Sequence, residues 1–349
     1  MNHALLLEAA RAGDEDAFAR IVEPHRRALH AHCYRMLGSV ADAEDALQDA
    51  LLNAWRGLGR FEGRSSLRSW LYTIATNACL RAIERRPKRV LPIDYAPAAD
   101  PHDGLAEPLV ESVWVEPYPD ERLGLEDGLA GPEARYEQRE SVELAFIAAL
   151  QHLPARQRAV LILRDVLGFS ARETAGALEM SPPGVDSALQ RAHKAVDGRL
   201  PDRSQQAVLD ALPDRGLRAI VERYVDAFER GDVDALVEML AADGTFTMPP
   251  LPTWYRGRDA VAAFLKSHVL ASENRWRLVP ARANGQLAFG NYSWDAERQR
   301  FLPRSLSVLT LGADEITEMT TFIGLDVLAD FGLPDELPPR VGVRGGDGR

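Results

Sequence analysis

The sequence predicts a multidomain protein in which two all-α domains precede an α+β domain. Apolar residues recur at helical spacing through about the first 90 residues and again over residues 144–200. Strand-like runs follow later, for example at residues 286–292 and 305–311. An acidic, proline-rich stretch lies between the two helical parts. Helices first and strands later are typical of separate all-α and α+β domains.

Changes of composition along the chain indicate the domain boundaries. Between Asp94 and Glu143, fourteen acidic residues stand against three arginines, and six prolines interrupt the stretch. Such a composition predicts a flexible acidic linker whose last part becomes helical near Ala134. The expected parts are a first helical domain at 1–93, the acidic linker at 94–135, a second helical domain at 136–200, a short linker at 201–213, the α+β domain at 214–336 and a disordered tail at 337–349.

Composition and charge exclude several classes of protein. A hydrophobic content of 46% and a charged content of 27% are ordinary for a soluble chain, and no apolar run reaches the ~18 residues of a membrane span. The apolar run at residues 5–7 is too short for a signal peptide, and Cys33 and Cys79 cannot make a disulfide framework. We therefore expect a cytoplasmic protein with no membrane partner. Because the net charge is −11, any contact with DNA must come from local basic patches.

The first helical domain contains a helix with an acidic face, which begins near Ser39 and runs through Trp55. Leu47 and Leu51 belong to its buried stripe, and carboxylates recur on the opposite side. On its own, this pattern indicates a solvated face whose carboxylates favour the positive end of the helix dipole. The polar side chains of the acidic face are Asp42, Glu44, Asp45, Gln48 and Asp49.

A turn at residues 61–66 leads into a second helix, which has a basic face and ends in a cationic cluster. A surface of this kind suits contacts with phosphates, and Phe61, Trp70 and Tyr72 could stack on unpaired bases. The alternatives are core packing, which we favour for Trp70, and cations that complement a helix C-terminus. The outward residues are Arg68, Asn77, Arg81 and Arg85, and the cluster is Arg86, Lys88 and Arg89.

Residues 153–196 predict a helix that runs into a helix-turn-helix. Ser170 and Glu173 have the spacing of a capping box, and Ser181 followed by Pro182 predicts the start of the last helix. Two short helices, the second with small polar and basic residues outward, suit insertion into a major groove. An ordinary helical hairpin in a core is the alternative. The outward residues of the last helix are Pro183, Ser187, Gln190, Arg191 and Lys194.

The order of these features resembles the bacterial sigma factors of the extracytoplasmic-function (ECF) type, over about residues 14–90 and 140–197. The resemblance rests on the acidic-faced helix, on Phe-Glu-Gly-Arg-Ser-Ser-Leu-Arg-Ser-Trp from position 61, and on Leu-Pro-Ala-Arg-Gln-Arg from position 153. It implies two helical domains, called region 2 and region 4, that bind core RNA polymerase and promoter DNA. Asp186 departs from the family, which often carries a basic or amide residue there, and its carboxylate could accept from a cytosine amino group.

The resemblance also implies a role for each group of residues. The acidic face matches the surface that docks on the clamp helices of the polymerase β′ subunit. The flap of the polymerase β subunit is a second expected partner. The 61–66 loop and the basic helix match the elements that hold a flipped base of the −10 element and melt it. The implied sites are Asp42, Glu44, Asp45, Gln48 and Asp49 for core polymerase; Phe61, Glu62, Gly63, Arg64, Ser65, Arg68, Asn77, Arg81 and Arg85 for the −10 element; and Ser181, Pro183, Ser187, Gln190, Arg191 and Lys194 for the −35 element.

The C-terminal part resembles the SnoaL-like branch of the NTF2 fold, a curved sheet with helices around a conical pocket. The similarity lies in the amphipathic helix at 217–228, the strand at 246–250 and the helix after Gly257. Sigma factors with such an extension form a subgroup in which it resembles an inbuilt regulator, and a small-molecule or protein ligand is left open. Candidate pocket residues are Tyr224, Met248, Trp254, Tyr255, His268, Trp276, Tyr292 and Phe322.

An aromatic pair in the acidic linker, Trp114 and Tyr118, lies in a segment that also resembles this subgroup. Because aromatic residues make good interface anchors, we expect the pair to hold the linker to the C-terminal domain.

We expect a sigma factor without an active site, a cofactor or a metal. Catalysis would need a general base in the pocket, and no spacing singles one out. His30, His32 and Cys33 lie close together but lack a fourth ligand, so core packing is expected. The alternatives are a SnoaL-like cyclase or isomerase fused to a DNA-binding domain, and a helix-turn-helix regulator that acts without polymerase. The block at residues 42–89 distinguishes a sigma factor from a regulator that acts without polymerase, because a repressor needs no acidic docking helix.

Overall fold

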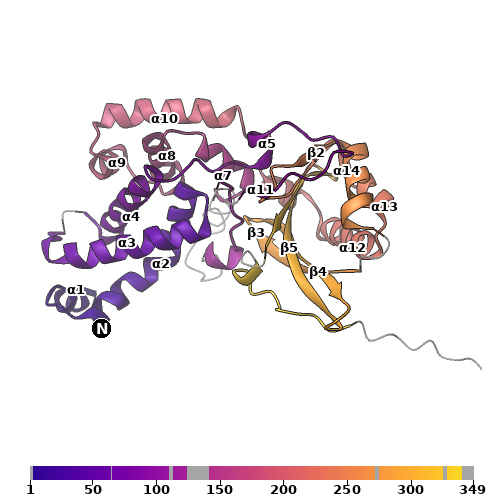
Figure 1. Ribbon diagram of the computed structural model, residues 1–349. Coiled ribbons are helices and arrows are strands. Elements are labelled where there is room, and N and C mark those ends of the chain that lie inside the picture. The colour runs from indigo at the N-terminus through magenta and orange to yellow at the C-terminus, as the bar shows by residue number, and fades with distance from the viewer. Residues whose placement is uncertain are drawn as a thin grey trace, which may run out of the picture. The chain divides into compact units, whose positions relative to one another are not determined.

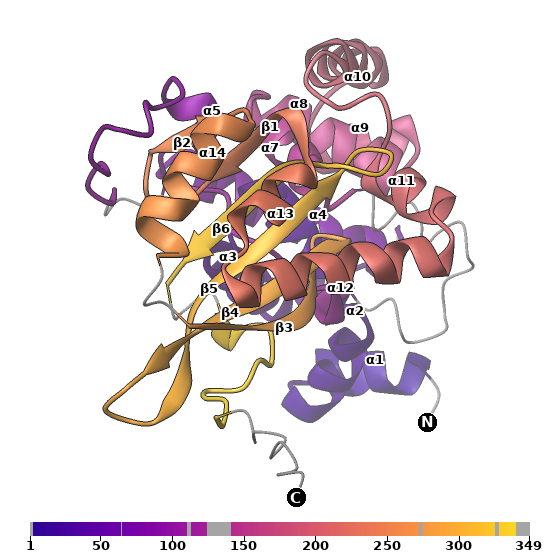
Figure 2. The same ribbon diagram turned by 90° about the vertical axis from the view of Figure 1, so that its right-hand side faces the viewer.

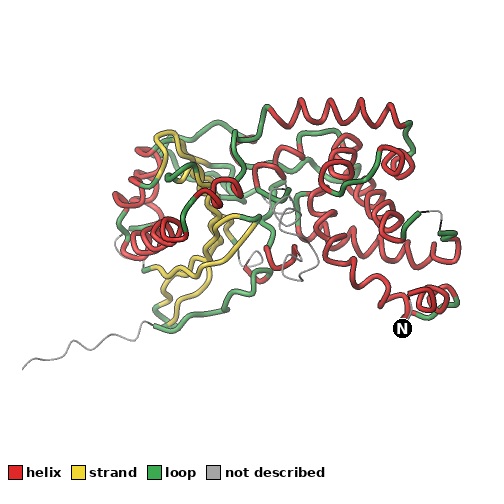
Figure 3. The backbone as a smooth tube through the Cα atoms, turned by 180° about the vertical axis from the view of Figure 1, so that it is seen from behind, coloured by secondary structure: helices red, strands yellow, loops and turns green. Residues whose placement is uncertain are grey.

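The computed structural model describes residues 3–63, 65–109, 113–123, 141–271, 275–324 and 328–339. The chain divides into two units, and it crosses between them more than once. The first unit comprises Met1–Tyr95, Leu109–Ala207 and Ala283–Gly285, and the second comprises Ala96–Pro108, Val208–Arg282 and Gln286–Arg349. Helices build the first unit, and the strands lie in the second (Figures 1 and 3). The predicted order of helical domains followed by an α+β domain is confirmed.

Side-chain caps set the starts of the three long helices in the first part of the helical unit. Asp14, Ser39 and Ser66 each accept a hydrogen bond from a backbone N–H three residues further on. Gly38 ends the first of these helices with φ 70°, a left-handed conformation that suits glycine. The elements are α1 (His3–Arg11), α2 (Glu15–Leu37), α3 (Val40–Gly57), the 3-10 turn η1 (Leu58–Arg60), α4 (Leu67–Ile83) and α5 (Pro92–Tyr95).

The second part of the helical unit holds the helix-turn-helix. The predicted capping box of Ser170 and Glu173 is confirmed, and so are the cap at Ser181 and the first helical position of Pro182. The helix expected from Leu153 begins two residues later and ends as a π-helix. The elements are η2 (Asp120–Leu123), α7 (Leu144–Gln151), α8 (Ala155–Leu161), the π-helix η3 (Ile162–Val166), α9 (Ala171–Leu178), α10 (Pro182–Asp197) and α11 (Gln205–Ala211).

Part of the stretch that composition predicts as a flexible linker is packed against its own unit. Trp114 and Tyr118 are buried. Residues 96–108 belong to the second unit, where the indole N–H of Trp254 donates to the carbonyl of Ala96 (2.7 Å). Composition reports average polarity, so a few well-placed aromatic residues can order an otherwise acidic segment. The predicted helix near Ala134 and the tail beyond residue 339 lie outside the described residues.

A six-stranded sheet in the order β2-β1-β6-β5-β4-β3 organises the second unit. β1 and β6 run parallel, whereas the pairs β1–β2, β4–β5 and β5–β6 are antiparallel. Helices α12, α13 and α14 cover one face (Figure 2), where Tyr224 packs on Phe289 at 5.0 Å. The elements are α12 (Asp214–Arg230), α13 (Val233–Glu238), β1 (Leu240–Thr247), β2 (Trp254–Arg256), α14 (Arg258–Phe264), the π-helix η4 (Leu265–Val269), β3 (Trp276–Ala283), β4 (Gln286–Asp295), β5 (Arg300–Leu311) and β6 (Ile316–Ile323). Sequence periodicity did not predict β2, because three residues are too few to show alternation.

Candidate nucleic-acid interface

α3 carries most of the predicted polymerase face at its surface. Asp45, Gln48 and Asp49 are exposed, and Glu44 is half-buried. The Gln48 amide donates to the Glu44 carboxylate (3.2 Å), which also lies 3.6 Å from Nε2 of His30. These four side chains form a continuous polar patch that a partner could reach.

Asp42 differs from the other members of this face, because it is buried. Its side chain pairs with the guanidinium groups of Arg86 and Arg89, with Nη2 of Arg89 at 2.6 Å from Oδ2. Arg89 is itself 5% exposed and donates to the carbonyl of Trp114 (2.7 Å) and to the carboxylate of Glu116 (3.3 Å). In this arrangement Asp42 and Arg89 form a buried ion pair with each other, so neither side chain is exposed to polymerase or to a phosphate. A pattern within one helix cannot reveal a partner 47 positions away.

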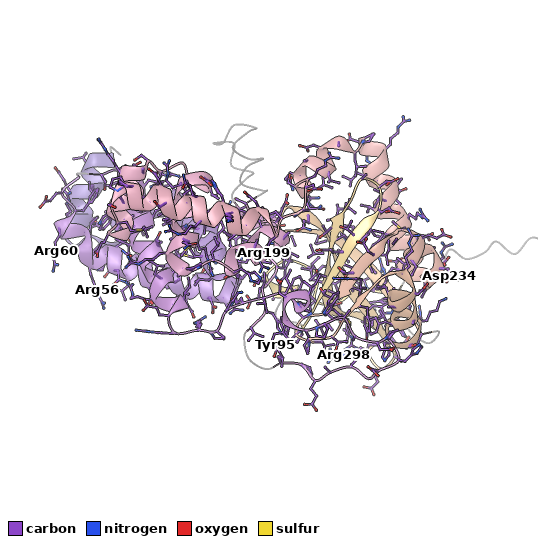
Figure 4. The ribbon with its side chains drawn as sticks, turned by 90° about the horizontal axis from the view of Figure 1, so that it is seen from above. Arg56, Arg60, Tyr95, Arg199, Asp234 and Arg298 are labelled. Carbon is purple, nitrogen blue, oxygen red and sulfur yellow. The ribbon has the colours of Figure 1, made fainter. Side chains whose placement is uncertain are left out.

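The basic face of α4 keeps its predicted outward residues. Arg81 and Arg85 are exposed, and Asn77 is half-buried. Asn77 and Arg81 line a hollow of about 480 Å³ between α3 and α4, together with Asp49, Leu52, Asn53, Arg56 and Ile74. Arg56 and the nearby Arg60 point outward from this end of the helical unit (Figure 4). The hollow therefore joins residues that the sequence assigns to polymerase with residues that it assigns to DNA.

The turn before α4 is divided between buried and exposed residues. Phe61 is 8% exposed and packs on Trp70, with ring centroids 4.9 Å apart, and its carbonyl accepts from Arg11. Glu62, Gly63 and Ser65 are exposed, whereas Arg64 lies outside the described residues. Phe61 would have to leave Trp70 before it could stack on a base.

The start of α4 contacts the helix-turn-helix within the same unit. The guanidinium of Arg68 lies over the rings of Tyr72 (5.1 Å) and Phe169 (5.2 Å), and it donates to the carbonyl of Leu167 (3.2 Å). Ser69 donates to Glu173 (3.3 Å). Hydrogen bonds from Ser170 and Ser69, together with the charge of Arg68, lower the pKa of Glu173. In this arrangement the Arg68 guanidinium is occupied by contacts with the second part of the helical unit.

α10 presents a polar face whose reverse side is buried. Val185, Ala188, Ala192 and Val196 pack inward. Ser181 caps the helix by accepting from the Gly184 N–H (3.2 Å). All the residues predicted for the −35 element are exposed, namely Ser181, Pro183, Ser187, Gln190, Arg191 and Lys194, and Asp186 is exposed beside them.

The eight candidate pocket residues of the second unit lie on both faces of the sheet. On the helix-covered side, Tyr224, Met248 and Tyr255 are buried in the core and Trp276 packs against it. His268 is exposed and stacks on Phe264 at 5.1 Å. On the other side, Tyr292 packs on Phe301 and Leu337. Trp254 and Phe322 alternate with the core-facing Tyr255 and Met319 along their strands, so they too point away from the helices.

Sequence reasoning missed Asn284, the residue between β3 and β4. Its side chain is fully buried and bonds within the first unit to Tyr34, to Tyr118 and to the carbonyl of Val142. The Asn-Gly pair at 284–285 signals a tight turn between strands, but nothing local signals burial. The two aromatic residues expected to anchor the linker make different contacts. The ring of Trp114 packs on the ring of Tyr95, with centroids 5.3 Å apart, whereas the main chain of Tyr118 pairs with Asn284.

In the part of the chain that the structure describes, no helix is both long and apolar enough to cross a membrane. In the same residues, no group of three or more His, Cys, Asp or Glu side chains could hold a metal ion.

Comparisons with known families match the three parts of the chain. Residues 21–89 match Sigma-70 region 2, residues 143–196 match Sigma-70, region 4, and residues 221–319 match the SnoaL-like domain.

Known relatives extend the similarity to nearly the whole chain. The chain is 42% identical over 329 residues to the ECF RNA polymerase sigma factor SigG of Mycobacterium tuberculosis, covering 94% of this chain and 86% of SigG. It is 34% identical over 189 residues to SigM of the same organism, covering 54% of this chain and 80% of SigM. The fold is similar to the crystal structure of the Mycobacterium tuberculosis sigma factor SigJ, with a TM-score of 0.55, 23% identity, and coverage of 88% of this chain and 97% of that one. The chain therefore belongs to the ECF RNA polymerase sigma factors, in the form that carries a C-terminal SnoaL-like domain.

Proposed function

We propose that this sigma factor binds core RNA polymerase through the exposed acidic patch of α3 and reads the −35 element with α10. The observation that carries the proposal is the two-sided character of α10. Its apolar side is buried, and all six predicted base- or phosphate-contacting residues are exposed. An arginine or an amide on such a face can form paired hydrogen bonds with a base edge in the major groove.

For the −10 element, we propose that α4 and the turn before it bind the unpaired strand. Arg81, Arg85 and Asn77 supply cationic and amide groups, and the hollow beside them has room for a base. Asp45, Gln48 and Asp49 supply the polymerase contact, with Glu44 at its edge. Because Asp42 is buried with Arg89, we assign it a structural role.

We further propose that the C-terminal domain regulates the sigma factor and performs no catalysis. The buried groups on the helix-covered side are mostly apolar or hydroxyl-bearing, and the one histidine among the candidates, His268, is exposed. A SnoaL-like fold does not by itself imply an enzyme. Because the partner is RNA polymerase, the proposed site of action is the cytoplasm.

The test is run-off transcription with core polymerase and the full chain on a library of promoter fragments. Transcripts with common −35 and −10 sequences are the expected result. A chain that binds core polymerase through α3 should lose both binding and transcripts in Asp45→Arg. If neither the full chain nor any variant binds core polymerase, the proposal is wrong and a regulator that acts on DNA alone replaces it.

A further inference from the structure

Arg158 of α8 is a buried cation whose contacts in the described part of the chain are with neutral groups. Its side chain is 4% exposed. Its two Nη atoms donate to the carbonyl of Met36, to the side-chain oxygen (2.5 Å) and carbonyl (3.1 Å) of Gln151, and to the carbonyl of Leu153 (3.3 Å). Among the same described residues, its Nε has no hydrogen-bond partner. A buried charge without an opposite charge is costly, so an anion from outside the chain would stabilise this one.

The Arg158 side chain lines a hollow of about 330 Å³ in the helical unit, and three further cations line it with Arg158. These are Arg86, Lys88 and Arg89, which follow the end of α4. One carboxylate, that of Asp42, also lines the hollow, and it is already paired with Arg86 and Arg89. The charges of Lys88 and Arg158 therefore remain without a carboxylate among the lining side chains.

The contacts of Lys88 leave its charge in the hollow. Its Nζ lies 2.7 Å from Nδ1 of His152 in the turn between α7 and α8. Burial lowers the pKa of His152, which favours the neutral ring. Because an ammonium group can only donate, Nδ1 accepts and the ring proton is on Nε2, 3.2 Å from the carboxylate of Asp94. Asp94 also pairs with Arg199 (3.5 Å), which lies just after the end of α10 (Figure 4). Lys88 thus meets the neutral ring, and the carboxylate is shared by two other groups.

Electrostatics within the helical unit agree with an excess of positive charge at this place. Burial lowers the pKa of Lys88, and the charges of Arg199 and Arg158 lower it further, against the opposing effect of Asp94. Burial also lowers the pKa of Arg158 to about 10. Each cation is therefore held where a negative ligand would be favoured.

The number and kind of donors favour a phosphate group over a carboxylate. A phosphate monoester carries about −1.5 to −2 charges near pH 7, which matches the two cations Lys88 and Arg158, whereas a carboxylate carries only one charge. An arginine and a lysine are also the usual donors to phosphate oxygens. The volume lies at the lower end of the roughly 300–1,000 Å³ of small-molecule sites. A DNA duplex is too wide to enter a hollow in which Arg158 is 4% exposed.

We propose that this hollow binds the phosphate group of a small molecule, with Lys88 and the Nε of Arg158 as the principal donors. Lys88 lies in the segment that matches region 2, and Arg158 lies in the segment that matches region 4. The ligand would therefore contact both sigma regions of the helical unit. Its binding requires neither a promoter nor core polymerase, so the site stands apart from the proposed function.

The experiment is calorimetric titration of the full chain with inorganic pyrophosphate in magnesium-free buffer, with the ionic strength held constant by sodium chloride. Lys88 is exposed, so Lys88→Gln removes the charge without disturbing the core. Lys88→Arg keeps the charge. The matched control is Lys266→Gln, since Lys266 is an exposed lysine of the second unit that pairs with Asp234 (2.8 Å). Circular dichroism and thermal melting check that the variants remain folded.

We expect saturable binding of pyrophosphate by the unsubstituted chain and by Lys266→Gln, and about tenfold or more weaker binding by Lys88→Gln. Lys88→Arg should retain most of the affinity. Pyrophosphate should also raise the melting temperature of the unsubstituted chain more than that of Lys88→Gln.

The proposal is overturned if the unsubstituted chain gives no heat of binding up to about 1 mM pyrophosphate, or if Lys88→Gln binds as tightly as the unsubstituted chain. Competition with a short duplex that lacks promoter sequences distinguishes the two sources of phosphate. The duplex should leave bound pyrophosphate in place. If it displaces pyrophosphate, and Lys88→Gln weakens the binding of both equally, the cations contact the DNA backbone and the small-molecule site is wrong.

Discussion

The neighbouring carboxylates Asp42 and Asp45 on α3 have opposite surroundings, and this difference can be tested. Asp45 is exposed and forms a 3.3 Å ion pair with the exposed Arg86. We expect Asp45→Arg to abolish binding to core polymerase while the melting temperature stays close to that of the unsubstituted chain. Asp16→Arg, at an exposed position of α2, is the control and should bind normally. Normal holoenzyme assembly by Asp45→Arg would remove the docking assignment.

Asp42→Asn should act on stability rather than on docking. It removes the closer of the two carboxylates that pair with the buried guanidinium of Arg89, and breaking a buried ion pair costs up to about 3–5 kcal/mol. Chemical denaturation measures this cost. A variant as stable as the unsubstituted chain would mean that the remaining ion pair with Glu116 is sufficient for Arg89.

Arg191 should contribute to sequence recognition. Removing an arginine that contacts a guanine in the major groove costs roughly 1–3 kcal/mol and relaxes the preference at that base. We expect Arg191→Ala to weaken binding to the matched −35 element while its binding to altered elements changes little. Arg20→Ala, exposed on α2, should have no effect. Equal weakening on all sequences would mark Arg191 as a phosphate contact.

His32 gives the stability of region 2 a dependence on pH. Burial, with a smaller contribution from the charge of Arg35, lowers the pKa of His32 from 6.5 to about 3. The unfolded chain therefore binds a proton below pH 6.5 that the folded chain excludes, so stability falls as the pH drops from 6.5 toward 3. The expected slope is about 1.4 kcal/mol per pH unit once the pH is well below 6.5.

Denaturation at pH 7, 6 and 5 measures this slope in the unsubstituted chain and in His32→Gln. The variant is less stable overall, since it loses the hydrogen bond between Nε2 and Thr76 (2.9 Å), but its slope should be flatter. His102→Gln, at an exposed site, should keep the original slope. Identical slopes for all three chains would show that another group controls the acid response.

Among the elements, α9 depends on its cap. The Ser170 hydroxyl accepts from the Glu173 N–H (3.2 Å), and the Glu173 carboxylate accepts from the Ser170 N–H (2.9 Å). We expect Ser170→Ala to cost about 1 kcal/mol and to weaken −35 binding equally on all sequences, because it loosens the support of α10. Ser170→Thr retains an oxygen at the same place and should be close to neutral. Loss of sequence preference in Ser170→Ala would point to a direct base contact.

Elements whose signals are local were predictable from the sequence. The capping box at Ser170, the cap at Ser181 and the exposed face of α10 each depend on residues within one or two helical turns. The partners of Asp42 and Asn284 were not predictable, because both depend on contacts between distant segments. The candidate pocket residues lie on both faces of the sheet for a second reason. A list of aromatic residues does not say which face of a strand each occupies until the register is known.

For the whole molecule, the sheet of the second unit should depend strongly on its aromatic core. Phe289 of β4 is 1% exposed and packs on Tyr224, so Phe289→Ala should cost about 3–5 kcal/mol in the second unit. Chemical denaturation of the full chain measures this cost. A variant as stable as the unsubstituted chain would show that neighbouring side chains fill the space left by the ring.

The division of the chain between the units also affects how a new molecule matures. Residues 1–207 leave the ribosome before Ala283–Gly285 are made, and the interval is 78 residues long (285 − 207). At about 5–20 residues per second, synthesis of that interval takes about 4–16 s. For this time, Tyr34, Tyr118 and Val142 of the nascent chain exist without Asn284, the residue that pairs with all three. This buried contact of the helical unit can therefore form only after more than three quarters of the chain has been made.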